Sequence, residues 1–252
     1  MRRINARIRT GRGYGIALTA TLPMGSQTKP LVVLCHGLGI DSQKPLLVSI
    51  RTELLNASYG VVQFDFAGHG KSGGGIQQRL VGTFIRDLDT VVHWLAIRSI
   101  SNQEGIVVIG YSIGALTALI YAGLKPKRLR AVALIGCNAS SKEKFKELQA
   151  RGKIRFERTY WVIGRTKVAR PFWTQRNHYE PRLYAGAIRI PTLLICGAKD
   201  VTNPVRESRL LYQWIKAPKQ LAVIPGSDHY FTSTGSQLRT AHVIHAWLHR
   251  VL

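Results

Sequence analysis

The sequence of 252 residues contains few cysteines, few acidic residues and no long apolar segment. Its three cysteines include no Cys-x-x-Cys pair, which argues against both a disulfide framework and a zinc site. No apolar run approaches the roughly 18–20 residues that a membrane-spanning helix requires. The basic N-terminus is not followed by the apolar core of a secretory signal peptide. These absences lead us to expect a cytoplasmic protein with no transmembrane segment and no bound metal.

Positive charge, by contrast, is abundant. The 36 Lys and Arg outnumber the 13 Asp and Glu, so the formal net charge is +23. Residues 138–189 alone hold 13 basic and 4 acidic residues. Such a surface attracts anionic substrates, acidic lipids or nucleic acid, although a solvated basic surface without a partner is the simpler interpretation. Because no nucleic-acid-binding motif accompanies the charge, we expect no nucleic acid partner and at most a weak attraction to anionic surfaces.

Short apolar runs alternate with helical patterns along most of the chain, which is typical of parallel strands joined by helices. We expect strands at residues 5–9, 15–22, 31–35, 61–64, 105–109, 131–135, 192–196 and 220–224. We expect helices at residues 45–57, 82–97, 113–122, 204–214 and 236–251. The first two strands flank a glycine-containing turn and should form an antiparallel hairpin. The sequence therefore predicts an α/β fold, with a mostly parallel eight-stranded sheet covered by helices on both faces.

Residues 138–189 interrupt this alternation, because 52 residues are too many for a simple connection between two strands. Within this segment, residues 152–164 alternate like a small strand or hairpin. We predict that 138–189 form an inserted cap over the ends of the strands, and that 1–137 and 190–252 form the core domain. The cap is rich in aromatic residues, most of which should pack against the core.

The strongest chemical signal is Gly110-Tyr111-Ser112-Ile113-Gly114, which lies between an apolar strand and an apolar helix. A tight turn between strand and helix projects the serine Oγ clear of the sheet, and the flanking glycines let the two elements approach without Cβ clashes. The pentapeptide alone arises readily by chance in a chain with 24 glycines, so the strand-to-helix context carries the prediction. We interpret Ser112 as a nucleophile.

A serine nucleophile requires a base, and the base requires an acid that orients it. Asp200 and His229 each follow a predicted strand, so both should lie at the edge of the sheet that carries Ser112. Asp65 also ends a strand, but it precedes a glycine-rich loop that it can hold through Asx-type hydrogen bonds. Asp228 adjoins the proposed base and suits a role in pinning its own loop. We predict a triad of Ser112, His229 and Asp200, with Asp65 and Asp228 as alternatives for the acid.

Acyl chemistry also requires two backbone N–H groups directed at the oxygen on which charge develops. One should come from Ile113, the residue that follows the nucleophile. The other should come from the loop after strand 31–35, where Leu38 has the appropriate position in His36-Gly37-Leu38-Gly39. We interpret His36 as a structural residue of that loop rather than as a second base.

These residues together resemble the α/β-hydrolase superfamily. The resemblance rests on His36-Gly37, Phe64-Asp-Phe-Ala-Gly-His-Gly-Lys-Ser-Gly73, Gly110-Tyr-Ser-Ile-Gly114, Gly197-Ala-Lys-Asp200 and Gly226-Ser-Asp-His229. It covers the chain from Leu31 to the C-terminus and implies the α/β-hydrolase fold with the nucleophile, acid and base in that order. Within the superfamily, the chain resembles the cinnamoyl/feruloyl-type esterases, from which it departs by Tyr and Ile beside the serine. The resemblance implies an acyl-enzyme mechanism with no metal and no organic cofactor.

We therefore expect a serine carboxylesterase that hydrolyses small esters with short-chain or aromatic acyl groups. Tyr111, Trp161 and Trp173 are candidates for substrate contact. A monoacylglycerol or lysophospholipid hydrolase, a serine-aminopeptidase-like hydrolase and a non-catalytic binding module are the alternatives. The sequence leaves the oligomeric state open.

Overall fold

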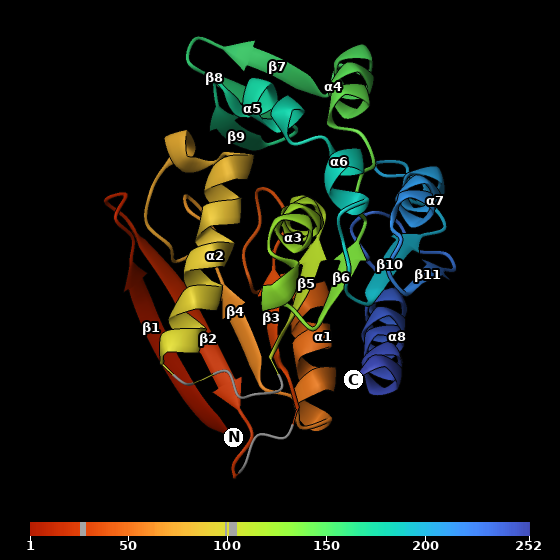
Figure 1. The fold of residues 1–252 in the computed structure, drawn as a ribbon. Helices are drawn as coiled ribbons and strands as arrows, with labels where there is room; N and C mark the ends of the chain where they lie inside the picture. Colours follow the sequence, from red (N-terminus) through yellow and green to blue (C-terminus); the bar gives the residue numbers. More distant parts are fainter. Residues whose placement is uncertain (26–28, 99, 101–104) are drawn as a thin grey trace.

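The computed structural model describes residues 1–25, 29–98, 100 and 105–252. Its central feature is an eight-stranded sheet with the strand order β1-β2-β4-β3-β5-β6-β10-β11 (Figure 1). The strands are β1 (Arg2–Arg9), β2 (Gly15–Leu22), β3 (Leu31–Cys35), β4 (Val61–Phe64), β5 (Ile106–Tyr111), β6 (Ala131–Ile135), β10 (Thr192–Gly197) and β11 (Lys219–Ile224). β2 pairs antiparallel with β1 and β4, and the other neighbouring strands pair parallel. The predicted mostly parallel sheet and its N-terminal hairpin are confirmed.

Helices cover both faces of this sheet. The helices of the described chain are α1 (Pro45–Asn56), α2 (Val81–Ile97), α3 (Ile113–Leu124), α4 (Ser141–Ala150), α5 (Phe172–His178), α6 (Pro181–Ala185), α7 (Val205–Trp214) and α8 (Thr234–Val251), with 3₁₀ turns η1 (Ile76–Gln78) and η2 (Pro126–Arg128). Of these, α4 and α5 belong to the insertion between β6 and β10. α1 and α8 pack together on one face, whereas α2, α3, α6 and α7 lie on the other (Figure 1).

The central strands are apolar on both faces because both faces are covered. In β3, Val33 and Cys35 belong to the apolar cluster beneath α2 and α3. Val32 and Leu34 belong to the cluster beneath α1 and α8. Side chains alternate between the faces of a strand, so a continuous apolar run contributes to both layers at once.

The predicted elements of the core agree closely with the observed ones. Four predicted strands match to the residue, and no end of the others differs by more than three residues. The ends of the five predicted helices differ by at most two residues. None of the helices that the structure describes is long and apolar enough to cross a membrane.

The insertion between β6 and β10 folds as a small sheet with helices around it (Figure 1). The expected hairpin in 152–164 is confirmed as β7 (Ile154–Glu157) and β8 (Tyr160–Ile163), which pair antiparallel. A third strand that we did not predict, β9 (Thr166–Ala169), pairs with β8. Although α6 lies within the predicted insertion, it packs against α3 of the core. The division of the chain at residues 138 and 189 therefore stays a prediction.

Candidate active site

Ser112 occupies a strained turn between β5 and α3. Its φ of 56° and ψ of −116° place a non-glycine residue in a region that L-amino acids rarely adopt. Two neighbours hold the turn, since the N–H of Ser112 donates to the Ile135 carbonyl at 2.8 Å and its carbonyl accepts from the Leu116 N–H at 3.1 Å. Strain of this kind persists only where the surrounding structure determines it, and it occurs often at functional sites.

The two glycines that flank the turn are required by close backbone contacts. A Cβ on Gly110 would collide with the Gly114 carbonyl, and a Cβ on Gly114 would collide with the Cys35 carbonyl. These contacts bring the N-terminus of α3 against the carboxyl end of β3. The turn therefore lies directly beside the loop that follows β3.

Asp200, His229 and Ser112 form a chain of hydrogen bonds. The Nδ1 of His229 lies 2.7 Å from Asp200 Oδ2, and its Nε2 lies 3.2 Å from Ser112 Oγ. Both His229 and Asp200 are buried, which shields their interaction from water. A proton on Nδ1 leaves Nε2 free to accept the Ser112 hydroxyl proton. The structure thus brings together the three residues that we predicted from the sequence as a triad.

Backbone groups hold the Asp200 carboxylate in place. Its Oδ1 accepts from the N–H of Thr202 at 2.8 Å and from the N–H of Asn203 at 2.7 Å. The other predicted acids make different contacts. Asp65 accepts from the backbone N–H groups of Ser42 and Lys71, and Asp228 accepts from the N–H and hydroxyl of Thr232. These contacts favour Asp200 over both alternatives as the partner of the imidazole.

Tyr111 bonds His229, and Asn203 bonds Gly136, which lies against the His229 ring; neither role was predicted. The hydroxyl of Tyr111 donates to the His229 carbonyl at 3.1 Å, with the ring centroids 5.7 Å apart. The Asn203 amide donates to the Gly136 carbonyl at 2.6 Å, and a Cβ on Gly136 would lie 3.3 Å from His229 Cε1. Asn203 lies only three residues after Asp200, and this closeness in sequence was the one indication that it could lie near the proposed acid.

The expected oxyanion-hole donors lie in the two segments that meet at the turn. Within the described part of the chain, neither the Leu38 N–H nor the Ile113 N–H has a hydrogen-bond partner. Gly37 lies against the Tyr111 ring, because a Cβ there would lie 3.0 Å from Tyr111 Cε1. Both N–H groups are therefore free to donate, and their catalytic role stays a prediction.

Two buried histidines hold the loop that carries Leu38. His36 Nδ1 donates to the Gly37 carbonyl at 2.7 Å, and its Nε2 accepts from the Phe66 N–H at 2.9 Å. His69 Nε2 accepts from the Gly39 N–H at 3.2 Å. Burial lowers the pKa of His36 and lowers the pKa of His69 to about 3, so both imidazoles are neutral acceptors at pH 7. The expected structural role of His36 agrees with these bonds.

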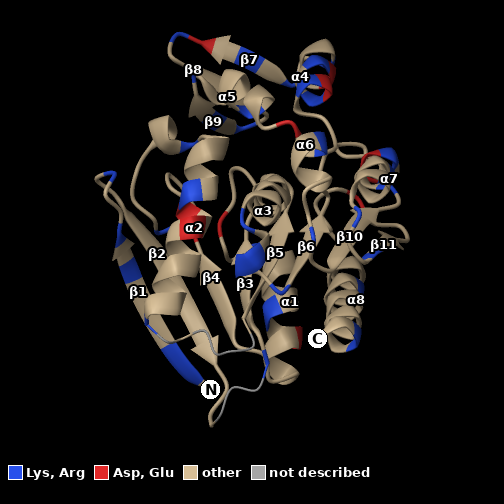
Figure 2. Cartoon of the chain, in the orientation of Figure 1, with Lys and Arg blue, Asp and Glu red and all other residues tan. Residues whose placement is uncertain are grey.

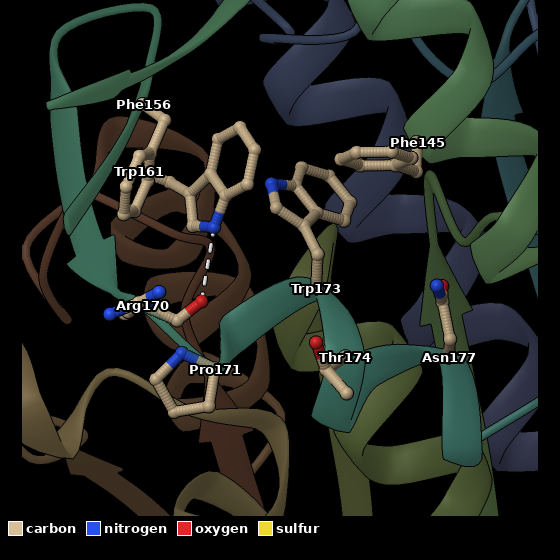
Figure 3. A pocket seen from close by; sticks show the side chains of 8 residues that line it. All are labelled: Phe145, Phe156, Trp161, Arg170, Pro171, Trp173, Thr174 and Asn177. Carbon is tan, nitrogen blue, oxygen red and sulfur yellow. Dashed lines mark hydrogen bonds between the residues drawn. The ribbon is translucent and has the colours of Figure 1, made fainter. Parts of the chain in front are cut away.

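The insertion between β6 and β10 contains a cavity of about 580 Å³. It is lined by Phe145, Phe156, Trp161, Arg170, Pro171, Trp173, Thr174 and Asn177 (Figure 3). The Trp161 indole N–H donates to the Arg170 carbonyl at 3.0 Å, and the rings of Phe145 and Trp173 lie 5.0 Å apart. Trp161 and Trp173 thus share one cavity, whereas Tyr111 lies beside His229. Ser112, His229 and Asp200 are not among the residues that line the cavity.

The described residues include no group of three or more His, Cys, Asp or Glu that could hold a metal ion. Cys35, Cys137 and Cys196 are buried free thiols, and burial raises the pKa of each. A raised pKa keeps a thiol protonated and therefore unreactive at neutral pH.

A family model described as alpha/beta hydrolase fold matches residues 30–161, which is more than half of the chain. The chain belongs to the α/β-hydrolase fold family. The expected resemblance and the expected fold class are therefore confirmed.

Relatives of the chain exist in Escherichia coli and Bacillus subtilis. An E. coli protein named as an uncharacterized 31.7 kDa protein in the traX-finO intergenic region is 24% identical, over 94% of this chain and 96% of its own. The uncharacterized protein YqkD of B. subtilis is 26% identical, over 88% of this chain and 72% of its own.

Solved α/β-hydrolase structures share the fold. Est1E from Butyrivibrio proteoclasticus, solved with ferulic acid bound, has a TM-score of 0.84 at 17% identity and covers 98% of both chains. The esterase Pf2001 of Pyrococcus furiosus has a TM-score of 0.78 at 22% identity, over 99% of this chain and 91% of its own. An esterase domain from Rhodothermus marinus has a TM-score of 0.78 at 21% identity, over 99% of each chain.

Proposed function

We propose that the protein is a serine hydrolase that cleaves small carboxylic esters through an acyl-enzyme. The observation that carries this proposal is the hydrogen-bond chain from Asp200 through His229 to Ser112, which ends at a hydroxyl on a strained turn. A serine hydroxyl is a weak nucleophile at neutral pH, and an oriented imidazole is the group that activates it.

The reaction would proceed in two half-reactions. Ser112 Oγ attacks the ester carbonyl carbon while His229 Nε2 takes the hydroxyl proton. The tetrahedral intermediate then collapses, and the departing alkoxide takes that proton from Nε2 and leaves as the alcohol. Water attacks the acyl-enzyme by the same route, releasing the carboxylic acid and restoring Ser112. Asp200 orients the imidazole and stabilises its protonated form.

Leu38 and Ile113 are the proposed oxyanion-hole donors. Their N–H groups lack partners among the described residues and lie in the two segments that Gly114 brings together. The loss of one such donor typically raises the barrier by about 3–4 kcal/mol. We place Tyr111 in the proposal as a positioning residue, because its hydroxyl bonds the His229 carbonyl.

An ester is the favoured substrate class, and its acyl group is short or aromatic. Two of the similar structures are named esterases, and Est1E binds ferulic acid, an aromatic acid. The aromatic cap cavity with Trp161 and Trp173 suits such a group. We propose that residues 138–189 act as the cap of the site, that the enzyme works in the cytoplasm, and that it requires no cofactor.

Substitution of Ser112 by alanine tests the proposal. We expect Ser112→Ala to lower kcat/KM for p-nitrophenyl acetate by at least about 10³-fold without changing the circular dichroism spectrum. Ser49→Ala, on α1 and away from the turn, is the matched control and should keep full activity. A fluorophosphonate should label the wild-type protein and not Ser112→Ala.

Other results of these assays would favour one of the alternative functions. Retained turnover by Ser112→Ala would remove this residue from the mechanism. A wild-type protein that neither hydrolyses esters nor reacts with the fluorophosphonate would be a binding module. A preference for long acyl chains that grows on anionic vesicles would indicate a monoacylglycerol or lysophospholipid hydrolase.

A further inference from the structure

Buried polar atoms without a partner are concentrated in one part of the molecule. Five buried side-chain nitrogen or oxygen atoms in the described residues have no hydrogen-bond partner, and all lie between the end of β6 and the start of α6. They belong to Asn138, Trp173, Arg176, Asn177 and Glu180. Three of the five atoms are donors: the Asn138 amide nitrogen, the Trp173 indole nitrogen and Arg176 Nε. Buried donors are almost always paired in folded proteins, so this cluster requires an explanation.

Arg176 is the charged member of the cluster. Only 7% of this residue is exposed, and its Nη2 donates to Asn138 Oδ1 at 2.8 Å. Its guanidinium lies 5.2 Å from the centre of the Trp173 ring. Among the described carboxylates, none lies within ion-pair distance of it, although Glu180 is near enough to raise its pKa. Burial lowers the pKa of Arg176 to about 10, so the group is still a cation at pH 7.

A buried cation without a bonded counter-ion destabilises a fold. A bound anion would supply the missing charge and accept from the free donors. The guanidinium edge that contains Nε is suited to this because it can donate two parallel hydrogen bonds to a carboxylate.

One member of the cluster, Asn138, follows a segment that contacts Ser112 and His229. The Ile135 carbonyl accepts from the Ser112 N–H, and Gly136 lies against the His229 ring. Asn138 follows Gly136 by two residues, which corresponds to at most about 7 Å of extended backbone. Through its bond to Asn138, Arg176 is therefore joined to the segment that contacts Ser112 and His229.

The cluster also borders the cap cavity. Trp173 and Asn177 line that cavity and lie on one face of α5 with Arg176. In Figure 3 the indole nitrogen of Trp173 points toward the side of the cavity where Trp161 lies. The Trp173 ring is thus part of the cavity wall with its indole N–H buried in that wall, and Arg176 lies against the same ring.

We propose that Arg176 and Asn138, assisted by the Trp173 indole N–H, bind an anionic group on the substrate. The substrate class is an ester that carries a free carboxylate, such as a half-ester of a dicarboxylic acid or an acylated hydroxybenzoate. This proposal rests on the proposed function, because it names the charge of the ester that reaches Ser112. Lys and Arg outnumber Asp and Glu and are spread over most of the fold, and this excess of positive charge would favour the approach of such substrates (Figure 2).

Two matched pairs of esters test the proposal. The first pair is 4-acetoxybenzoate and its neutral methyl ester, with the charge on the leaving group. The second is monomethyl adipate and methyl hexanoate, with the charge on the acyl group. For each pair the measured quantity is the ratio of kcat/KM for the anionic ester to kcat/KM for the neutral one. Intrinsic reactivity cancels when this ratio is compared between variants.

We expect Arg176→Met to lower this ratio at least fivefold in one of the two pairs. Arg165→Met is the matched control, because it removes one positive charge from an exposed position of the cap and should leave the ratio within twofold. Asn138→Asp is the second variant, which puts a carboxylate beside the guanidinium as an internal counter-ion, and it should also lower the ratio at least fivefold. Smaller changes in both variants, or an equal change in Arg165→Met, would overturn the proposal.

A binding measurement separates this proposal from the proposed function. In calorimetric titrations, the Ser112→Ala variant should bind benzoate but not benzamide. The double variant Ser112→Ala/Arg176→Met should not bind benzoate. If no neutral ester is hydrolysed but benzoate binds in this way, the hydrolase proposal fails and the anion site stands. If neutral esters are hydrolysed through Ser112 and benzoate binds no better than benzamide, the anion site fails alone.

Discussion

The sheet edge that carries Ser112, His229 and Asp200 differs from the insertion of residues 138–189, the proposed cap, in how its polar groups are satisfied. In the core, both oxygens of Asp200 have partners, Asp65 accepts from two backbone N–H groups, and both nitrogens of His36 and His69 are bonded. In the insertion, five buried polar atoms lack partners, all within the described chain. The polar groups around Ser112 and His229 are therefore fixed by hydrogen bonds, whereas several buried polar groups of the insertion are not, and this difference is the basis for the ligand proposed there.

The same two regions differ in how they bury apolar surface. Every residue of β3, β5 and β6 is buried. The cap strands are mostly half-buried or exposed, and Phe156 keeps 43% of its surface exposed. A fully covered strand stabilises the fold, while partly exposed aromatic rings around a cavity can exchange solvent contact for ligand contact.

The largest expected effect is on the core side of this comparison. Asp200→Asn should lower kcat roughly 10³–10⁴-fold, because an amide holds the imidazole in the wrong tautomer and cannot stabilise its protonated form. Steady-state kinetics with p-nitrophenyl acetate measures this loss. The same substitution at Asp228 is the control, since that side chain bonds Thr232 and not His229. An equal loss in both variants would contradict the assignment of the acid.

Gly114→Ala should test how tightly the core holds the turn. The added Cβ would collide with the Cys35 carbonyl, so the free energy of unfolding should fall by about 2–3 kcal/mol. Urea denaturation measures this change. Gly235→Ala, at a helical position with open space around it, should instead be neutral or slightly stabilising. Equal stability of the two variants would show that the turn can relax.

Acid should destabilise the core through the loop histidines. Burial depresses the pKa of His69 in the folded protein to about 3, below the unfolded value near 6.5, so the unfolded chain binds a proton that the native protein does not. Stability is therefore full above pH 6.5 and falls as the pH drops toward 3, by about 1 kcal/mol per pH unit for this histidine. Urea denaturation at pH 7 and pH 5 measures this slope. His69→Gln should reduce the slope, and an unchanged slope would assign the acid sensitivity to other groups.

The smallest expected effect is in the cap. Trp161→Ala should lower kcat/KM for an aromatic acyl ester roughly tenfold, mainly through KM, because it removes a wall of the cavity. The value for p-nitrophenyl acetate should change by less than twofold. A loss that is equal for both esters would show that Trp161 supports the fold of the cap rather than the substrate.

Much of the core could be predicted because its signals are local. Leu31–Cys35 is a continuous apolar run, and a run of this kind identifies a strand covered on both faces. Ser112 was identified from its neighbours in sequence, and Asp200 and His229 from their positions after strands. Parallel strands direct their carboxyl ends to one edge of the sheet, so local positions implied a spatial meeting.

The cap was less predictable because its elements are short and partly exposed. β9 has four residues and an exposed lysine, so its apolar pattern is too brief to identify a strand. Arg176 contributed only to the count of basic residues, since nothing in the residues around it indicates burial. Its environment is set by Asn138, 38 residues earlier in the chain.

The amino-acid sequence by itself therefore determined the order of strands and helices, the turn at Ser112 and the three residues proposed for the triad. Only the tertiary structure decided which polar groups are buried and which of them have partners. The physical reason is that periodicity and turn chemistry depend on adjacent residues, whereas the burial of a charge depends on segments far apart in the chain.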